Sequence, residues 1–318
     1  MSGYYLLLNG EYAYNKSYSV GYDFGSIKRL DRYTMGALST LYICFALKKH
    51  DSDFIKAYFD SLKWYREIYK ISAEGARNHG LLNVPTDAFF ETKHYLPQNL
   101  NEQRKIADFM IALEHRIDAQ QSLVDNLKKY KRGAIAHILS GKSKAFSSAS
   151  SWMQKNLGDL CSEFRSGRNI SSTLIHETGD YPVYGGNGIR GYCDRYSHEG
   201  EYVVIGRQGA LCGNVRIIQG QNYLSEHAIA VRANADNDTG FLLYLLGFMK
   251  LGQYSDQGAQ PGLAVNKLLR LKCTVPDKKT QSKIASVLLR LDSQLSNQEK
   301  MLSILINQRK AFLQQLFI

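Results

Sequence analysis

The amino-acid sequence predicts an α+β fold in which two mixed, largely β domains alternate with two long helices that pair as an antiparallel coiled coil. The first observation is a repeat. Gln103 aligns with Gln281, an offset of 178 residues, and the register holds without a gap for about ten helical turns. The second is the helical spacing of apolar residues in both copies. The third is a series of short β-rich runs, separated by glycine turns, between the copies.

Each predicted helix has an apolar stripe over nearly five heptads, which is typical of a coiled coil. With Ile106 at heptad position a, the expected seam uses positions a, d and e. In the first helix these are Ile106, Leu113, Gln120, Leu127 and Ala134 at a, Phe109, Leu123 and Tyr130 at d, and Met110, Ile117, Val124 and Ile138 at e; in the second they are Ile284, Leu291, Gln298, Leu305 and Phe312 at a, Val287 and Met301 at d, and Leu288, Leu295 and Leu302 at e. Each helix starts after a proline, and Asn99 with Glu102 has capping-box spacing.

One glutamine occupies the same a position in each helix, Gln120 in the first and Gln298 in the second. A polar residue in an apolar seam lowers stability but fixes the register. Antiparallel pairing would bring the two side chains together near the middle and place the β domains at opposite ends. About 38 residues of helix span roughly 57 Å, which suits two half-sites on duplex DNA about one turn apart. A purely structural dimerisation coil is the alternative.

The repeat divides the chain into four segments. We expect a first β domain over residues 1–97, a first long helix over 98–144, a second β domain over 145–276 and a second long helix over 277–318. A chain of 318 residues is long enough for two domains with separate cores.

Composition excludes several classes of protein. The longest apolar stretches, such as residues 241–246, are far too short to span a membrane, and no charged leader precedes an apolar core. The sequence therefore predicts a cytoplasmic protein with no membrane partner. The five cysteines are scattered without a CxxC pair, which predicts buried, reduced thiols and neither a metal site nor a bound cofactor.

The net charge of +11 favours a polyanionic partner, because neutralised phosphates release counterions. Most of the excess lies on the predicted helices, at +4 for each helical segment against +2 and +1 for the first and second β domains. A solvated helix surface would explain the same excess.

The second β domain has polar glycine loops between its expected strands. Strands are predicted at residues 181–184, 202–205 and 214–218, and a helix around residues 240–251. The loop after the first strand contains GxGxxG, but the segment that follows has strand character where a dinucleotide-binding unit needs a helix. We therefore do not predict a nucleotide site.

The first β domain is rich in tyrosine. Tyr12, Tyr14, Tyr18 and Tyr22 surround a short polar and basic segment, residues 15–17. Such a pattern suits contact with sugar and phosphate, and it equally suits the exposed face of a half-buried sheet.

A glycine turn with polar side chains occurs near the end of each β domain, at residues 75–81 and 258–263. Turns of this kind can present Arg to guanine, or Gln and Asn to adenine. The conformational demands of a turn would also account for the glycines.

Signatures of catalysis are missing from the sequence. The five prolines are isolated, which excludes a [DN]PP[YF] methyltransferase motif, and Gly141-Lys142-Ser143 lacks the upstream glycine of a P-loop. The eight histidines are dispersed. The sequence thus predicts recognition without catalysis, whereas an enzyme acting on nucleic acid would need a clustered acidic or His/Cys site.

The chain resembles the specificity subunits of type I restriction-modification systems over nearly its whole length. The repeated helix pattern from Pro97 and Pro276 is similar to the two conserved regions of that family. Residues 181–188, 205–215 and 259–263 resemble one target-recognition domain, and residues 14–17, 25–30 and 75–80 resemble another type.

The resemblance implies a non-catalytic subunit that reads a bipartite site on double-stranded DNA, with two methyltransferase subunits and translocating restriction subunits as partners. Each β domain, or head, would read half of the site, and the paired helices would set the spacer. The implied DNA contacts are Tyr14, Asn15, Lys16, Ser17, Lys28, Arg29, Arg77, Asn78 and His79 in the first head, and Tyr184, Gly186, Asn187, Arg207, Gln208, Asn214 and Gln260 in the second.

The first head is shorter than the family pattern, because the repeat offset projected back from Pro97 falls before Met1. The apolar run at residues 4–8 would usually lie inside a domain. A truncated or silent cassette, a product of gene rearrangement, and a first head completed by another chain are all compatible with this pattern, as is a coiled-coil scaffold with no role on DNA.

Overall fold

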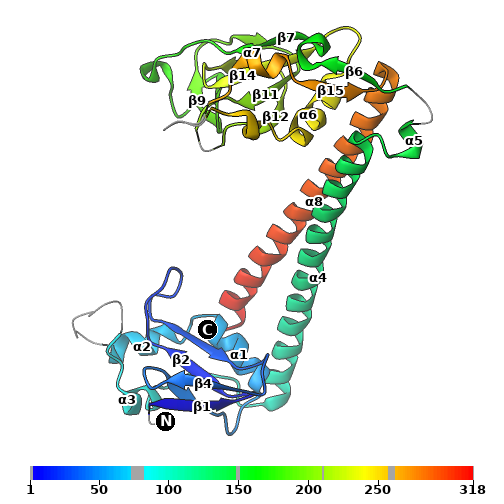
Figure 1. The fold of residues 1–318 in the computed structure, drawn as a ribbon. Coiled ribbons are helices and arrows are strands. Elements are labelled where there is room, and N and C mark those ends of the chain that lie inside the picture. Colours follow the sequence, from blue (N-terminus) through cyan, green and yellow to red (C-terminus); the bar gives the residue numbers. More distant parts are fainter. Residues whose placement is uncertain (1–2, 73–81, 148–150, 210, 257–261, 318) are drawn as a thin grey trace. The chain divides into compact units, whose positions relative to one another are not determined.

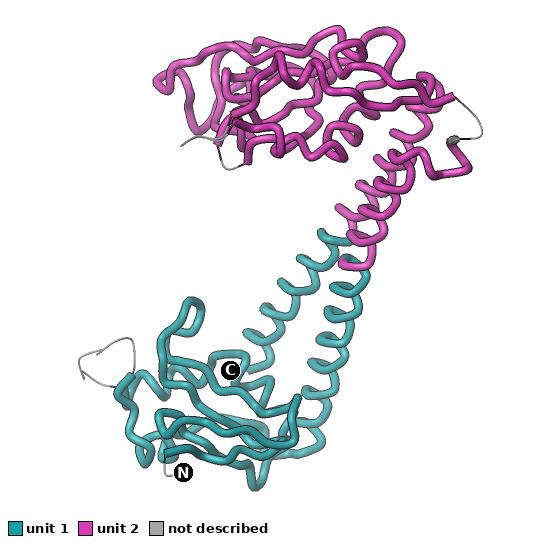
Figure 2. The backbone as a smooth tube through the Cα atoms, viewed as in Figure 1, with its two compact units in different colours: residues 1–124, 298–318 teal, residues 125–297 magenta. Residues whose placement is uncertain are grey.

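A computed structural model describes residues 3–72, 82–147, 151–209, 211–256 and 262–317 (Figure 1). The chain forms two compact units, residues 1–124 with 298–318 and residues 125–297 (Figure 2). Each unit contains one head and part of both long helices. No helix in the described residues is long and apolar enough to cross a membrane.

The described part of the first head contains two small sheets and three helices. The strands are β1 (Tyr4–Leu8), β2 (Tyr12–Asn15), β3 (Ser26–Arg29), β4 (Met35–Ser39) and β5 (Ile43–Phe45), and the helices are α1 (Ser52–Asp60), α2 (Tyr65–Ile71) and α3 (Thr86–Phe90). Strands β3, β2 and β5 form an antiparallel sheet in that order, and β1 pairs with β4. The core lies between the three-stranded sheet and α1, where Trp64 and Phe54 are fully buried.

The second head contains a larger set of strands. They are β6 (Met153–Asn156), β7 (Cys161–Ser166), β8 (Tyr181–Gly185), β9 (Gly188–Cys193), β10 (His198–Glu199), β11 (Tyr202–Gly206), β12 (Val215–Ile218), β13 (Gln221–Leu224), β14 (Ala228–Ala233) and β15 (Lys272–Val275). In the described residues these strands form three sheets, with strand orders β12-β11-β14-β7, β10-β13-β8-β9 and β15-β6. The helical elements are α5 (Lys144–Ser147), η1 (Leu157–Leu160), η2 (Ser172–Leu174), α6 (Thr239–Phe248), η3 (Leu251–Tyr254) and α7 (Val265–Leu269). The predicted strands and helix of this head are confirmed.

The two heads share a strand plan. In the first, β2 is flanked by antiparallel β3 and β5, and α1 follows β5; in the second, β11 is flanked by antiparallel β12 and β14, and α6 follows β14. The same tripeptide, Gly-Glu-Tyr, enters the central strand at residues 10–12 and 200–202. Its glycine has a positive φ in both heads, 88° at Gly10 and 101° at Gly200. The internal repeat therefore extends beyond the long helices into the heads.

The long helices, α4 (Leu100–Leu139) and α8 (Lys278–Leu316), pair antiparallel within each unit. In the first unit, Phe109 contacts Phe312 edge to face, while further along α4 Gln120 meets Gln298. In the second unit, Lys131 forms an ion pair with Asp292. Residue numbers rise along α4 while those of the partners fall along α8, which is the antiparallel pairing that the sequence predicts.

The predicted heptad frame was wrong by three positions. Of the residues assigned to d, Leu123, Tyr130 and Met301 are exposed, whereas Phe109 keeps a contact with Phe312. The assigned a and e residues form the seam, with Met110 and Val124 nearly fully buried. Along each helix the assigned a and e residues alternate at spacings of four and three. The residues assigned to a therefore occupy true d positions, and those assigned to e occupy true a positions. The apolar stripe was predicted correctly. Because three heptad positions carry apolar residues, the sequence alone did not show which two of them form the seam.

Each long helix begins with a buried glutamine that links it to its own head. Gln103 accepts a hydrogen bond at Oε1 from the backbone N–H of Asp51 at 2.9 Å, and Gln281 accepts one from that of Asp238 at 3.0 Å. The carboxylates of these aspartates cap α1 and α6. Each glutamine also donates to the carbonyl of the proline before its helix. At the start of α4, Asn99 accepts from the backbone of Asn101, not from that of Glu102 as a capping box requires.

Two expectations about apolar and thiol groups need correction. Strand β1 does not lie inside the domain: of its side chains only that of Leu7 is buried. The cysteines are all free thiols, as expected, but only Cys193 and Cys273 are buried. Burial raises the pKa of Cys273 to about 11, so this thiol is protonated at neutral pH.

Candidate nucleic-acid interface

Three turns of the second head meet beside the ends of β8, β11 and β14. They are the β8–β9 turn at Gly186, the loop after β11 that begins with Arg207, and the β13–β14 turn at residues 225–227. A Cβ atom at Gly186 would lie 2.6 Å from the carbonyl oxygen of Gln208 and 3.2 Å from that of His227. Glycine is required here because the backbones of all three turns approach one another. We call this group of turns the loop cluster.

Polar side chains bridge the loop cluster. Oε1 of Gln208 lies 2.5 Å from Nδ1 of His227, whose Nε2 lies 3.0 Å from a carboxylate oxygen of Glu226. Arg207 donates from Nη1 to the carbonyl of Glu226 at 3.3 Å and from Nε to that of Leu263 at 3.4 Å. These contacts hold the Arg207 and Gln208 side chains against neighbouring loops.

The loop cluster also has unused hydrogen-bonding capacity. Among the described residues, Ser225 Oγ and Glu226 Oε2 are buried without a hydrogen-bond partner. Arg207 uses long hydrogen bonds to carbonyl oxygens and has no carboxylate partner in the described part of the chain. Such groups can take up donors and acceptors from a ligand.

Two further arginines lie on the β8–β9 hairpin side of the cluster. The side chain of Arg190 crosses Gly185, with Cδ 2.5 Å from the position of a Cβ there, and the guanidinium of Arg216 lies against Gly188. Neither has an ion-pair partner among the described side chains. Sequence reasoning missed both, although the glycines that accommodate them were noted. A basic residue near a glycine turn was the available signal.

The remaining predicted contacts of the second head differ in exposure. Asn187 and Asn214 are exposed on the loops, while Tyr184 is half-buried and packs against the small apolar cluster that includes Tyr202 and Leu224. Gln260 lies outside the described residues, in the stretch just before Gly262, whose backbone bridges to Gln208.

Lys16 in the first head corresponds in position to Arg207 in the second. Each lies just after the central strand of its sheet. The carbonyl of Lys16 accepts from the backbone N–H of Leu82 at 3.0 Å, and that of Arg207 accepts from Leu263 at 2.9 Å. Leu82 directly follows the predicted polar glycine turn of its head, and Leu263 is the last residue of the other. The predicted residues Arg77, Asn78 and His79 lie in the first of these turns, outside the described residues.

Other predicted residues of the first head are partly accessible. Asn15 is half-buried and its Oδ1 accepts from the backbone of Ser17, which is exposed. Lys28 is exposed but forms an ion pair with Asp60 at 2.6 Å and lies over the ring of Tyr22. Burial lowers the pKa of Lys28, but the hydrogen bond to Asp60, the charge of Asp60 and the contact with Tyr22 together outweigh that effect, so the pKa is raised and the ammonium stays charged.

Tyr14 is a core residue, contrary to the prediction. It is fully buried, stacks on Phe89, meets Trp64 edge to face and donates its hydroxyl to the carbonyl of Phe24 at 2.8 Å. Tyr12 is equally buried. Aromatic residues at alternate positions here face the core of a small sheet, and neither ring is available to DNA.

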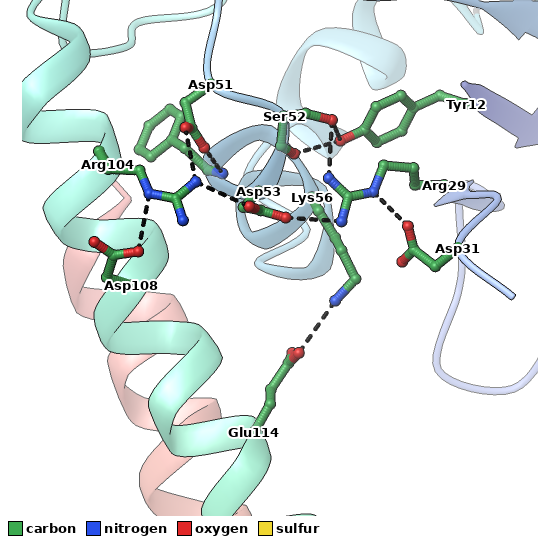
Figure 3. Close-up of polar contacts among 11 residues, drawn as sticks. Tyr12, Arg29, Asp31, Asp51, Ser52, Asp53, Lys56, Arg104, Asp108 and Glu114 are labelled. Atoms are coloured by element: carbon green, nitrogen blue, oxygen red, sulfur yellow. Dashed lines mark hydrogen bonds and ion pairs between the residues drawn. The ribbon is translucent and has the colours of Figure 1, made fainter. Parts of the chain in front are cut away.

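Arg29 also has a structural role in place of the predicted one. Its guanidinium donates to Asp31 at 2.6 Å, to Asp53 at 2.8 Å and to Ser52 at 2.9 Å, as Figure 3 shows. Burial lowers the pKa of Arg29, but the hydrogen bonds to Asp53 and Asp31 outweigh it and raise the pKa. The carboxylate of Asp53 also forms an ion pair with Arg104 of α4 at 3.1 Å. These linked ion pairs attach α1 to the long helix.

The described residues contain no group of three or more His, Cys, Asp or Glu side chains placed to hold a metal ion. What the loop cluster offers is a set of amide, imidazole and guanidinium groups, which suits hydrogen bonding to base edges and phosphates.

The sequence of this chain is similar to those of known proteins. Residues 149–304 match the family described as type I restriction modification DNA specificity domain. The specificity subunit of the type I restriction enzyme EcoprrI of Escherichia coli is 44% identical over 144 residues, which are 44% of this chain and 36% of that protein. A putative type I restriction enzyme specificity subunit of Haemophilus influenzae is 25% identical over 42% of this chain and 36% of its own length. Each match thus spans little more than a third of the relative.

Solved structures show the same fold over the whole chain. The S subunit of a type I restriction-modification system from M. genitalium matches with a TM-score of 0.66 at 20% identity, covering 98% of this chain and 84% of that one. A structure concerned with complex assembly and conformational transition of the type I system matches with a TM-score of 0.60 at 15% identity, covering 98% and 83%.

Proposed function

We propose a function from the premise that this chain belongs to the type I restriction-modification specificity subunit family: it recognises DNA sequence and has no catalytic role of its own. The observation that supports this most directly is the loop cluster. There, Arg207 and Gln208 from the loop after β11 converge with His227 from the β13–β14 turn. Arg and Gln are the side chains that discriminate guanine and adenine in the major groove.

Lys16 and its neighbours form the corresponding surface of the first head. Because Lys16 and Arg207 share a backbone environment, we propose that each head reads one half of a bipartite site. Asn15 and Ser17 flank Lys16 in the first head; in the second, Asn214 lies on the loop that begins with Arg207 and Asn187 lies in the β8–β9 turn. Arg77, Asn78, His79 and Gln260, which lie outside the described residues, stay among the proposed contacts.

The paired helices are proposed to set the spacer between the half-sites and to dock two methyltransferase subunits, with restriction subunits joining for cleavage. Support comes from the family and from the antiparallel pairing in each unit, which uses the two repeat copies in equivalent roles. Methyl transfer and ATP hydrolysis would then belong to the partners, in the cytoplasm where the DNA lies.

The proposal is tested by co-expressing the whole chain with a type I methyltransferase subunit and mapping methylated adenines across the host DNA. A bipartite motif with a fixed gap is the expected result. A half-motif or a palindrome would limit reading to the second head, and unmethylated DNA with a stable protein complex would favour a scaffold.

The role of the loop cluster is tested within the same assay by Gln208→Ala. Gln154→Ala serves as the matched control, since Gln154 is exposed on β6 outside the loop cluster. The first variant should change or lose the motif, and the second should leave it intact. Equal effects of both would argue against base reading by Gln208.

A further inference from the structure

Glu226 is the one acidic residue of the loop cluster in the described part of the chain. Its turn, residues 225–227, is fixed from two sides. The backbone N–H of Ser225 donates to the carbonyl of Tyr184 on β8 at 2.9 Å. On the other side, a Cβ atom at Gly167 would lie 2.4 Å from the carbonyl oxygen of Ser225, so the end of β7 packs directly on the turn. The Glu226 side chain therefore extends from a well-defined backbone position.

The carboxylate of Glu226 has more hydrogen-bonding capacity than its neighbours use. One oxygen, Oε1, lies 3.0 Å from Nε2 of His227, and the other, Oε2, is buried without a hydrogen-bond partner in the described residues. A carboxylate can accept about four hydrogen bonds. Because the Glu226 side chain is 32% exposed, a ligand on the loop cluster can reach it. A donor on such a ligand would relieve the desolvation penalty of an unpaired carboxylate oxygen.

The neighbouring arginine does not neutralise this carboxylate. Arg207 donates from Nη1 to the backbone carbonyl of Glu226 at 3.3 Å, and no ion pair joins the two side chains in the described structure. A negative charge on a surface that binds DNA repels phosphates and lowers affinity. The same charge is favourable where it meets a hydrogen-bond donor on the edge of a base. The position of Glu226 therefore favours contact with a base over contact with the DNA backbone.

Only two of the four bases carry a hydrogen-bond donor in the major groove. These donors are the N4 amino group of cytosine and the N6 amino group of adenine, whereas guanine and thymine present carbonyl oxygens at the same place. A carboxylate accepts from the amino groups and repels the carbonyl oxygens. A fixed acceptor of this kind therefore gives specificity partly by excluding the wrong bases.

We propose, on the basis of the DNA recognition proposed above for the second head, that Glu226 selects cytosine or adenine at one position of the half-site. The carboxylate accepts a hydrogen bond from the exocyclic amino group of that base. His227 is a positioning residue for this contact, because its imidazole lies between Oε1 of Glu226 at 3.0 Å and Oε1 of Gln208 at 2.5 Å. The loop cluster thus combines donors on Arg207 with an acceptor on Glu226.

The test uses the whole chain in complex with a type I methyltransferase subunit and a labelled duplex that carries the mapped motif. Each adenine of the second half-site is replaced in turn by a purine nucleoside without the N6 amino group, and each cytosine by a pyrimidinone nucleoside without the N4 amino group. At one position the wild-type complex should lose at least about tenfold in affinity, as expected for a hydrogen bond to a charged group.

Glu226→Ala identifies the residue that makes this contact. In this variant the same nucleoside replacement should change affinity by less than about threefold, because the acceptor is already gone. Preference at that single position should relax to all four bases while the rest of the motif is kept. Glu201→Ala is the matched control, since Glu201 is exposed just before β11 and the loop cluster lies at the other end of that strand. The control should keep both the motif and the sensitivity to the missing amino group.

Several outcomes would overturn the assignment. A wild-type complex that tolerates the loss of every amino group in the half-site would do so without any variant. An undiminished sensitivity in Glu226→Ala would assign the contact to another residue, and a loss of affinity shared by all sequences would reduce Glu226 to a structural role. Sensitivity to inosine in place of guanine, and to no other replacement, would move the contact to the minor groove. A wild-type complex with no sequence preference would instead reject DNA recognition by the second head, and this inference with it.

Discussion

Gln120 donates a hydrogen bond from Nε2 to Oε1 of Gln298 at 2.8 Å, and a second one to its backbone carbonyl at 3.0 Å. The two residues occupy equivalent positions of the repeat, 178 residues apart. Both are half-buried in an otherwise apolar seam. A shift of α4 against α8 by one heptad would place each amide against an apolar side chain, so the pair favours one register.

Replacing Gln120 by leucine leaves the Gln298 amide without its side-chain partner. We expect the single variant to be destabilised, and the Gln120→Leu/Gln298→Leu double variant to recover at least about 1 kcal/mol relative to it, because both polar groups are then gone. Urea unfolding of the two single variants and the double variant gives the coupling energy. Additive changes would show that the hydrogen bond contributes nothing to stability.

Glu114 on α4 links the C-terminal part of α8 to the first head. It accepts from Arg309 at 2.7 Å and from Lys56 at 3.1 Å, and Arg309 also contacts Asp60 at 3.0 Å. Burial raises the pKa of Glu114, but the hydrogen bond from Arg309 and the charge of Lys56 outweigh it, so the pKa lies below its usual value.

A carboxyl group whose pKa is lower in the folded state contributes stability above its unfolded pKa, about 4.3 for Glu, and loses it as pH falls through the folded pKa. Glu114→Gln should therefore reduce the free energy of unfolding at pH 7, and the difference from wild type should shrink as pH falls from 5 towards 3. Asp118→Asn on the exposed side of the same helix is the control. A difference that stays constant with pH would mean that Glu114 acts through packing alone.

A variant of Arg207 tests whether this side chain reads a base in the second head. If its guanidinium reads a base, Arg207→Glu should lower affinity for the selected sequence by at least about tenfold and relax preference at one position, consistent with roughly 1–3 kcal/mol for such a contact. Arg270→Glu makes the same charge change at an exposed position outside the loop cluster. Binding is measured at several salt concentrations. A loss shared equally by all sequences, with a shallower salt dependence, would make Arg207 a phosphate contact.

The architecture was predictable because the spacing of apolar residues in the sequence follows the period of the helices and strands that bury them. The repeat at Gln103 and Gln281, the helical stripe and the strands at residues 202–205 are patterns that burial imposes directly. The heptad frame was harder, since Phe109 and Leu123 are as apolar as the true seam residues and only packing distinguishes them.

The site residues were less predictable, because the polar or aromatic character of a residue does not show whether its side chain points into the protein or towards a ligand. Tyr14 and Arg29 look like ligand contacts in the sequence, yet one fills the core and the other joins an internal chain of charges. Arg190 and Arg216 become apparent only when the hairpin glycines beside them are seen in three dimensions. Long-range pairing, such as that of Lys16 with Leu82, has no signature in local sequence.

Gly186 tests the geometry of the loop cluster apart from its polar groups. A Cβ atom there would lie 2.6 Å from the backbone oxygen of Gln208, which is closer than real Cβ contacts, so Gly186→Ala must push the loops apart. We expect at least about a tenfold loss of affinity for the selected DNA, with at most about 3 kcal/mol of destabilisation because the strain is confined to turns outside the main hydrophobic core.

The matched control for Gly186→Ala is Gly247→Ala in α6. A Cβ at Gly247 meets nothing within 4 Å, so alanine there should raise stability by about 0.5–1 kcal/mol and leave DNA binding unchanged. Affinity is measured by titration of labelled duplex and stability by urea unfolding of the same preparations. Full DNA affinity in Gly186→Ala would show that recognition does not depend on the close approach of the three turns, and would move the interface elsewhere on the head.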